Sequence, residues 1–303
     1  MPRLTLAFRY LRRNKTLAIG LSILTFLALF SIGGSFFIDR KIDPYPLAGP
    51  ASVPPTLSYC PKKDPECAEI EPVAYPFGTD AQGRDMIAVA ISGTWLTMQI
   101  GLLAGIIGLG IGTTLGFTSA FYGGVYDLVI RWLVDVALTI PGLLVLVVIA
   151  SSLGEETIGI TSMGLIISAL AWRGPARVIR SQVLSMRERP YVMMARLNGM
   201  GGLSIIFKEM MPNLLPYLGA SLVGAVTGAI FASVGLAALG LGPLREPTLG
   251  VTLYWVMNQS AFTRQLWWWG AVPIVIIALV FVMLFLISIG LDELANPRVR
   301  RSE

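Results

Sequence analysis

Few side chains in this sequence have the types and the spacing that chemistry requires. The 303 residues include no histidine, which excludes histidine-based acid–base catalysis, catalytic triads and histidine-ligated metal sites. Arg131 and Asp135 stand four residues apart in an apolar stretch, where charged side chains are candidates for a proton relay. A pair of opposite charges at this spacing near a membrane boundary is more often structural, and we favour that interpretation.

Three consecutive tryptophans, Trp267, Trp268 and Trp269, form a second group with functional potential. Tryptophans at the start of an apolar segment are typical of the aromatic belt at a membrane surface. The alternative is a set of rings in an outer vestibule that stack on a sugar.

The composition places the chain in a membrane. Apolar residues make up 54% and charged residues 14% of the sequence, whereas a soluble domain has roughly 25% charged residues. A spanning helix needs about 20 mostly apolar residues. Six uncharged windows are candidates, at 16–38, 86–126, 136–154, 157–172, 210–244 and 265–291. We therefore predict an all-α polytopic membrane protein with six transmembrane helices, and we interpret 247–263, which contains polar residues, as an extramembrane or re-entrant loop.

The distribution of basic residues predicts the orientation. With a cytoplasmic N-terminus, sixteen Lys and Arg residues lie inside and seven outside, which agrees with the positive-inside rule. Both termini are then cytoplasmic, at 1–15 and 292–303. The apolar run at 16–38 is longer than the roughly 7–15 residues of a signal-peptide core, so we expect a retained first helix rather than a cleaved leader.

The loop at 39–85 is extracytoplasmic in this topology and rich in proline, which predicts an irregular excursion rather than a domain. Both cysteines of the chain, Cys60 and Cys67, lie in it. We expect them to form a disulfide, because the compartment is oxidising and the closed loop is short. Two free thiols are the alternative.

The cytoplasmic loop from 173 to 212 holds seven basic residues. Its interior, 192–208, has apolar residues at helical spacing interrupted by three glycines, which predicts a short helix, a turn and a second short helix. Exposed methionines and leucines on such an element favour a docking surface for a partner protein. A basic loop held near anionic lipid headgroups is the alternative.

Small residues recur at steps of three or four within two predicted helices, a spacing that lets helices approach closely in lipid. We predict helix packing at Gly101, Gly105, Gly108, Gly112, Gly116, Gly224 and Gly228. The alternative is that these glycines are simply common in membrane helices and have no special role in packing.

The cytoplasmic loop also contains Ala195, Gly199 and Pro212. Three residues separate Ala195 from Gly199, and twelve residues separate Gly199 from Pro212. This pattern resembles the Glu-Ala-Ala, three residues, Gly, nine residues, Ile-x-Leu-Pro signature of inner-membrane permease subunits of binding-protein-dependent ABC importers. Met193 and Met194 replace the glutamate and first alanine, and the isoleucine and leucine are also replaced. The resemblance assigns an ATPase-coupling loop, within 186–212, to Met193, Met194, Ala195, Arg196, Leu197, Asn198, Gly199, Met200 and Pro212.

Further motifs are similar to the dipeptide/oligopeptide/nickel branch, second-permease type. They are Arg12-Arg13-Asn14-Lys15, Pro76-Phe77-Gly78-Thr79-Asp80 with Gly83-Arg84-Asp85, Tyr122-Gly123-Gly124, Asp135 with Pro141-Gly142, Arg177-Val178 with Arg180, and Leu239-Gly240-Leu241-Gly242. Because these motifs run through most of the chain, the resemblance implies a type I ABC importer permease fold, with a five-helix core at 86–291 after the first helix.

The resemblance also implies partners and a location. The chain would pair with a second homologous permease in a bacterial or archaeal cytoplasmic (inner) membrane. It would bind two cytoplasmic ATPase subunits and receive substrate from an extracytoplasmic solute-binding protein; no nucleic acid is implied. The sequence contains no phosphate loop. We therefore expect no enzymatic activity and no cofactor in this chain, with ATP and Mg bound by the partners.

The substrate implied by the resemblance is a dipeptide or oligopeptide. An oligosaccharide is the alternative, suggested by the tryptophan run and by the departures at Pro247-Thr248-Leu249-Gly250. A secondary transporter is a remote alternative, because such proteins normally show broken helices and charges at the membrane midplane. A membrane-embedded enzyme would need a polar catalytic set that this sequence does not provide.

Overall fold

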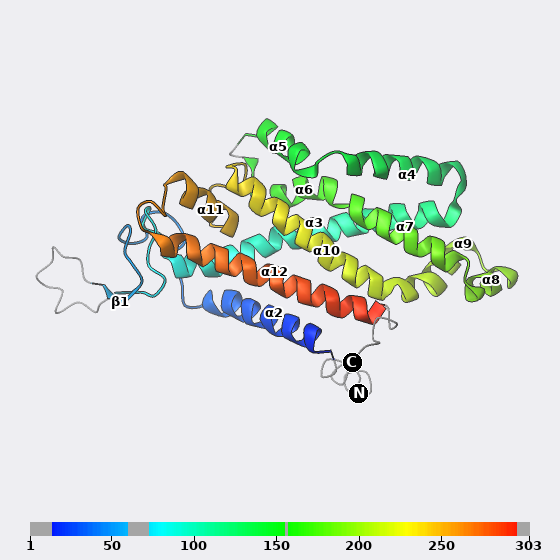
Figure 1. The fold of residues 1–303 in the computed structure, drawn as a ribbon, viewed down its shortest axis with the longest axis horizontal. Coiled ribbons are helices and arrows are strands. Elements are labelled where there is room, and N and C mark those ends of the chain that lie inside the picture. The colour runs from blue at the N-terminus through cyan, green and yellow to red at the C-terminus, as the bar shows by residue number, and fades with distance from the viewer. Residues whose placement is uncertain (1–13, 60–72, 155–156, 296–303) are drawn as a thin grey trace, which may run out of the picture.

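The computed structural model describes residues 14–59, 73–154 and 157–295. Cys60 and Cys67 lie outside these ranges, so their predicted disulfide stays a prediction. The described chain is mostly helical, with one small antiparallel sheet of β1 (Thr56–Tyr59) and β2 (Val73–Tyr75). Figure 1 shows an elongated bundle with this β-hairpin at one end and the short helices α8 (Pro190–Leu197) and α9 (Gly202–Ser204) of the basic loop at the other.

Helix α3 (Met86–Tyr122) is the centre of the bundle, and its 37 residues span about 55 Å. The Asp85 side chain caps its start by accepting a hydrogen bond from the Ile87 amide at 2.9 Å. Its end is set by Gly123, whose φ of +70° interrupts the helix. Around α3 pack α2 (Lys15–Gly34), α6 (Ile160–Ala171), α7 (Arg173–Arg187), α10 (Met211–Ala238) and α12 (Trp267–Ala295).

The predicted glycine contacts on α3 are found in the structure. Gly101 and Gly105 lie against α10, where a methyl group on Gly105 would approach Val226 Cγ2 to 2.5 Å. Gly108, Gly112 and Gly116 lie against the junction of α6 and α7, and a methyl group at each would collide with the backbone or side chain of that segment. One face of α3 therefore carries two close helix crossings.

Four described helices are long and apolar enough to span a membrane: α2, α3, α10 with its preceding turns, and α12. The other two predicted windows behave differently. The window at 136–154 is divided between α4 (Gly124–Thr139) and α5 (Gly142–Ser152), which meet at 81°. The window at 157–172 holds the 12-residue α6, which continues through the helical Trp172 into α7. The described residues therefore contain four candidate spans, or five if α4 and α5 form one bent span, and the predicted count of six is not confirmed, although every window holds a helix.

The break between α4 and α5 has a local cause. Ile140 precedes Pro141 and has an extended backbone with ψ of 123°, because the proline ring disfavours helical geometry in the residue before it. Since α4 begins at Gly124, Arg131 and Asp135 lie in the interior of this helix. Their 3.6 Å ion pair is exposed at both side chains, which fits the structural interpretation.

The segment 247–263, which we interpreted as an extramembrane or re-entrant loop, contains a short helix. Thr248 caps α11 (Leu249–Asn258), a helix with a buried face that packs against α3, α10 and α12. In Figure 1, α11 lies at the same end of the bundle as β1, opposite α8. The basic cytoplasmic loop and the proline-rich outer loop are thus at opposite ends, as the predicted topology requires.

Candidate functional site

The predicted coupling loop folds as a helical hairpin. It comprises α8 (Pro190–Leu197), a turn, α9 (Gly202–Ser204) and the π-helical turn η3 (Ile205–Met210), which leads into α10. Gly199 closes α8 with φ of +72°, and the Met200 amide donates to the Ala195 carbonyl at 3.1 Å. Glycine is favoured at this position because it adopts the left-handed backbone conformation that ends the helix. Close packing is not the reason. No atom lies within 4 Å of where a Gly199 Cβ would be.

Two faces of α8 have different roles. Val192 and Ala195 are buried against the ends of α3 and α7 and against η3. Met193, Met194 and Leu197 face outward and are 53%, 61% and 82% exposed. Ala195, which the sequence pattern assigned to the coupling loop as a whole, is therefore an internal packing residue, and the outward contacts come from its neighbours.

The exposed apolar surface extends beyond the signature. Leu203 and Phe207, from the second limb of the hairpin, are both 63% exposed. We call Met193, Met194, Leu197, Leu203 and Phe207 the end patch. Because η3 packs against α8, these residues belong to one end of the molecule. Leu203 and Phe207 were not among the predicted site residues; their apolar character beside glycines and a lysine was the available signal.

Helix α7 joins this hairpin to the transmembrane bundle through three arginines spaced seven residues apart. Arg187 donates from Nη1 to the Ala120 carbonyl at 3.0 Å. Arg180 donates from Nε and Nη2 to the Asp127 carboxylate, and Arg173 donates from Nη1 to the Ala137 carbonyl at 2.5 Å. Residues seven apart share a helix face. One face of α7 is therefore tied to the end of α3 and to both ends of α4.

A cavity of about 550 Å³ lies between α5, α6, α7 and α10. Gly224 and Gly228, on α10, line it, and no atom lies within 4 Å of a Cβ built at either position. Our prediction that these two glycines pack against another helix is therefore wrong within this chain. Their small size instead widens the cavity, to which Arg173 contributes the charged side chain of the lining.

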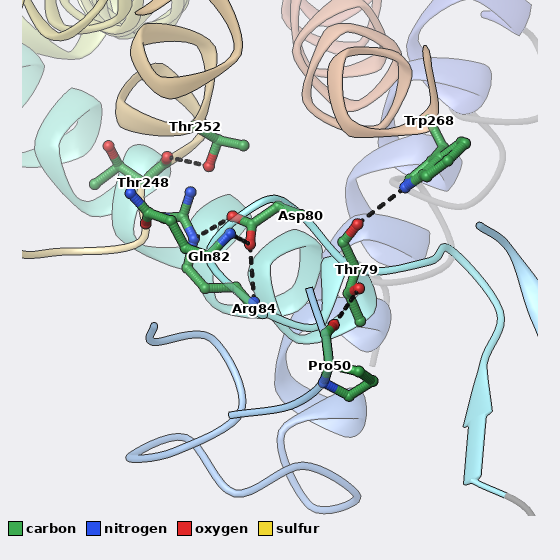
Figure 2. Close-up of polar contacts among 8 residues, drawn as sticks. All are labelled: Pro50, Thr79, Asp80, Gln82, Arg84, Thr248, Thr252 and Trp268. Carbon is green, nitrogen blue, oxygen red and sulfur yellow. Dashed lines mark hydrogen bonds and ion pairs between the residues drawn. The ribbon is translucent and has the colours of Figure 1, made fainter. Parts of the chain in front are cut away.

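At the opposite end, the motif around Thr79 and Arg84 forms a compact outer layer over α3 and α12 (Figure 2). Asp80 is buried and pairs with Arg84 Nε at 2.5 Å, while its other oxygen accepts from the Gln82 amide at 2.8 Å. Thr79 donates from Oγ1 to the Pro50 carbonyl at 2.6 Å. These bonds hold the loop that precedes α3 in one conformation.

Two of the three tryptophans are placed differently from either prediction. Trp268 is buried and donates from Nε1 to the Thr79 carbonyl at 3.0 Å, as Figure 2 shows, and Trp269 is fully buried. Gly78 lets Trp268 approach, because a methyl group there would lie 2.7 Å from Nε1. Only Trp267 of the three is exposed. Trp268 and Trp269 therefore anchor the outer layer and offer no exposed ring for a belt or for a sugar.

Asp85 has an unusual electrostatic environment at this outer end. Burial raises its pKa to about 6, and the nearby Asp43 adds to the shift, while the Ile87 amide acts in the opposite direction. The Asp85 amide also donates to the Asp43 carbonyl at 3.1 Å. The charge of the α3 cap therefore changes between mildly acidic and neutral pH.

With these elements in place, comparison with known proteins is informative. Residues 112–301, which hold the hairpin, α7 and the cavity, match the family described as binding-protein-dependent transport system inner membrane component. The chain belongs to this family. It is a permease subunit and a multi-pass protein of the cytoplasmic membrane.

Several curated relatives resemble the permease along most of its length. The dipeptide transport system permease protein DppC of Lactococcus lactis is 26% identical, over 96% of this chain and 90% of the relative. DppC of Haemophilus influenzae is 28% identical, over 96% and 94%. The oligopeptide transport system permease protein OppC of Mycobacterium tuberculosis is 29% identical, over 74% and 76%.

The fold is also found in a solved structure. An inward-facing MetNI methionine ABC transporter contains a chain that superposes on the permease with a TM-score of 0.56 and 18% identity. The match covers 70% of the permease and 97% of that chain. The architecture expected from the motifs, a helical ABC importer permease, is therefore confirmed.

Proposed function

We propose that this permease forms half of a translocation pathway for dipeptides or oligopeptides and that cytoplasmic ATPase subunits drive it through the end patch. The relatives named for dipeptide and oligopeptide transport support the substrate class. The alternative of oligosaccharides loses part of its argument, because Trp268 and Trp269 are buried. A second permease and an extracytoplasmic binding protein complete the proposed assembly.

The exposure of Met193, Met194 and Leu197 carries the coupling part of the proposal. Large apolar side chains on a short, solvent-facing helix are costly unless a partner covers them, and methionine adapts to the groove of a partner. The buried face of the same helix fixes its orientation through Val192 and Ala195. The hairpin therefore presents an apolar helix surface of the kind that docks into a groove of a partner protein.

The arginines of α7 provide a route from the end patch to the pathway. A movement of α8 displaces α7, to which it is joined by two residues, and α7 is bonded to α4 at Asp127 and Ala137. The break at Pro141 lets α4 tilt relative to α5. ATP and Mg would be bound by the ATPase subunits, and this chain would convert their motion into opening and closing.

Co-purification tests this function. The tagged wild-type permease, expressed with its partners, is expected to retain two ATPase subunits and to support peptide uptake in liposomes. A Met194→Asp, Leu197→Asp double variant should lose both the ATPase subunits and uptake. Leu57→Asp, an exposed leucine at the opposite end, is the matched control and should retain both. Retention of the ATPase subunits by the double variant would contradict the assigned docking surface.

A further inference from the structure

Arg173 has one guanidinium nitrogen whose hydrogen bonds are not used within the described chain. Nε donates to the Leu170 carbonyl at 2.9 Å, and Nη1 donates to the carbonyls of Ala137 and Ile140. These acceptors are neutral, and no described acidic side chain forms an ion pair with Arg173. Nη2 lies beside Gly142, where a methyl group would collide with it.

The surroundings of Nη2 define a site with one charge in apolar walls. The cavity of about 550 Å³ is lined by aliphatic and small residues, with Ser221 as a hydroxyl on the α10 side. Arg173 is the ionised residue of this lining. A cation in such surroundings attracts an anion more strongly than it would in water, because the apolar walls screen the charge poorly.

The position of the cavity along the bundle follows from the helices that line it. Ala171 and Trp172, directly before Arg173, pack against Gly108 and Gly112 of α3. Gly108 is about 33 Å along α3 from its outer end, at 1.5 Å per residue. Arg173 is therefore on the cytoplasmic side of the bundle's middle, next to the break between α4 and α5 at Pro141.

We propose that this Arg173 cavity receives the C-terminal carboxylate of a peptide during its passage through the permease. The inference rests on the proposed peptide transport and names a residue for it. Peptides of different sequence share a terminal carboxylate, which Nη2 can bond with charge assistance. Their side chains differ, and apolar walls built from glycine, alanine and leucine accept many of them without specific bonds.

Uptake of matched peptides tests the site. The complete transporter is reconstituted in liposomes, and uptake of a tripeptide with a free carboxylate is compared with uptake of its C-terminal amide. Arg173→Gln should lower uptake of the free acid about tenfold relative to the amide. Arg173→Lys, which keeps the charge, should lie between. The binding protein is identical in all samples, so its own preference cancels when the acid-to-amide ratios are compared.

A second variant separates the site from the support that Arg173 gives to α4. Gly228→Leu narrows the cavity from the α10 side while Arg173 is kept, and it should reduce uptake of acid and amide alike. Equal loss of acid and amide in Arg173→Gln would overturn the carboxylate site, as would normal uptake by Gly228→Leu. Separation of the two permeases in Arg173→Gln would show that a partner helix covers the cavity, and this too would overturn the proposal. If the wild type transports neither peptide, the proposed function itself fails.

Discussion

The Asp127 carboxylate accepts two hydrogen bonds from the Arg180 guanidinium, at 2.7 Å from Nε and 2.6 Å from Nη2, and joins the first turn of α4 to the middle of α7. Both side chains are mostly buried, so solvent screens the pair only partly. Arg187 and Arg173 extend the same face of α7 to the ends of α3 and α4. Helix α4, which precedes the break at Pro141, is therefore connected by side chains to α7, and through α7 to the coupling hairpin.

Asp127→Asn is expected to uncouple transport. The variant loses a charged, two-bond contact worth about 1–3 kcal/mol, so α7 can move without carrying α4. Peptide uptake per ATP hydrolysed, measured in reconstituted transporters, should fall several-fold while ATP hydrolysis continues. The reversed pair Asp127→Arg with Arg180→Asp should restore part of the uptake. Arg177→Gln, an exposed arginine on the same helix, is the control; an equal loss there would contradict the specific role of the pair.

Gly105→Val should destabilise the permease, because a side chain there enters Val226 of α10. Overpacking of this kind costs typically 1–3 kcal/mol. The matched control is Gly110→Val on the same helix, since no atom lies within 4 Å of a Cβ at that position. Thermal unfolding in detergent, followed by tryptophan fluorescence, should show a lower midpoint for Gly105→Val than for Gly110→Val. Equal midpoints would mean that α3 and α10 do not pack at this glycine.

Asp85 predicts a pH dependence of stability. Burial raises its pKa in the folded protein to about 6, above the ordinary value of 3.8, so the folded state binds the proton more tightly than the unfolded state. The resulting stabilisation is fully present below about pH 3.8 and is lost as pH rises through about 6. It amounts to at most about 3 kcal/mol. Asp85→Asn keeps a capping oxygen and removes the titration.

Melting temperatures of wild type and Asp85→Asn between pH 4.5 and 7 check this prediction. The difference between the two proteins should favour the variant increasingly as pH rises, because the wild-type carboxylate becomes charged in its half-buried position. Parallel curves over this range would show that Asp85 titrates near its ordinary value in the folded protein.

Gly199→Ala should loosen the coupling hairpin. An alanine at φ of +72° costs about 1 kcal/mol, whereas Gly201, two residues later, has φ of −64° and accepts alanine without strain. Neither position has an atom within 4 Å of a Cβ, so steric contact does not separate the variants. Hydrogen exchange of α8 should be faster in Gly199→Ala than in Gly201→Ala. Identical exchange would indicate that the turn is not held in the left-handed conformation.

The sequence by itself determined the membrane setting, the six helical windows, the helix–turn–helix form of the coupling loop and the glycine face of α3. These properties depend on local composition, on spacing along one helix and on the conformational freedom of glycine, all of which can be read without knowing which segments are neighbours. The motifs around Ala195 and Arg84 likewise identified the permease family because their spacing survives in the chain.

Only the tertiary structure decided which side chains face a partner, a cavity or the interior. Ala195 is buried while Leu197 is exposed, Gly228 lines a cavity while Gly105 packs, and Trp268 is bonded to Thr79, a residue 189 positions away. The ties from Arg173 and Arg180 to α4 join residues that are 36 and 53 positions apart. Such outcomes depend on the relative placement of helices, and in an almost uniformly apolar chain the local pattern does not distinguish one helix face from another.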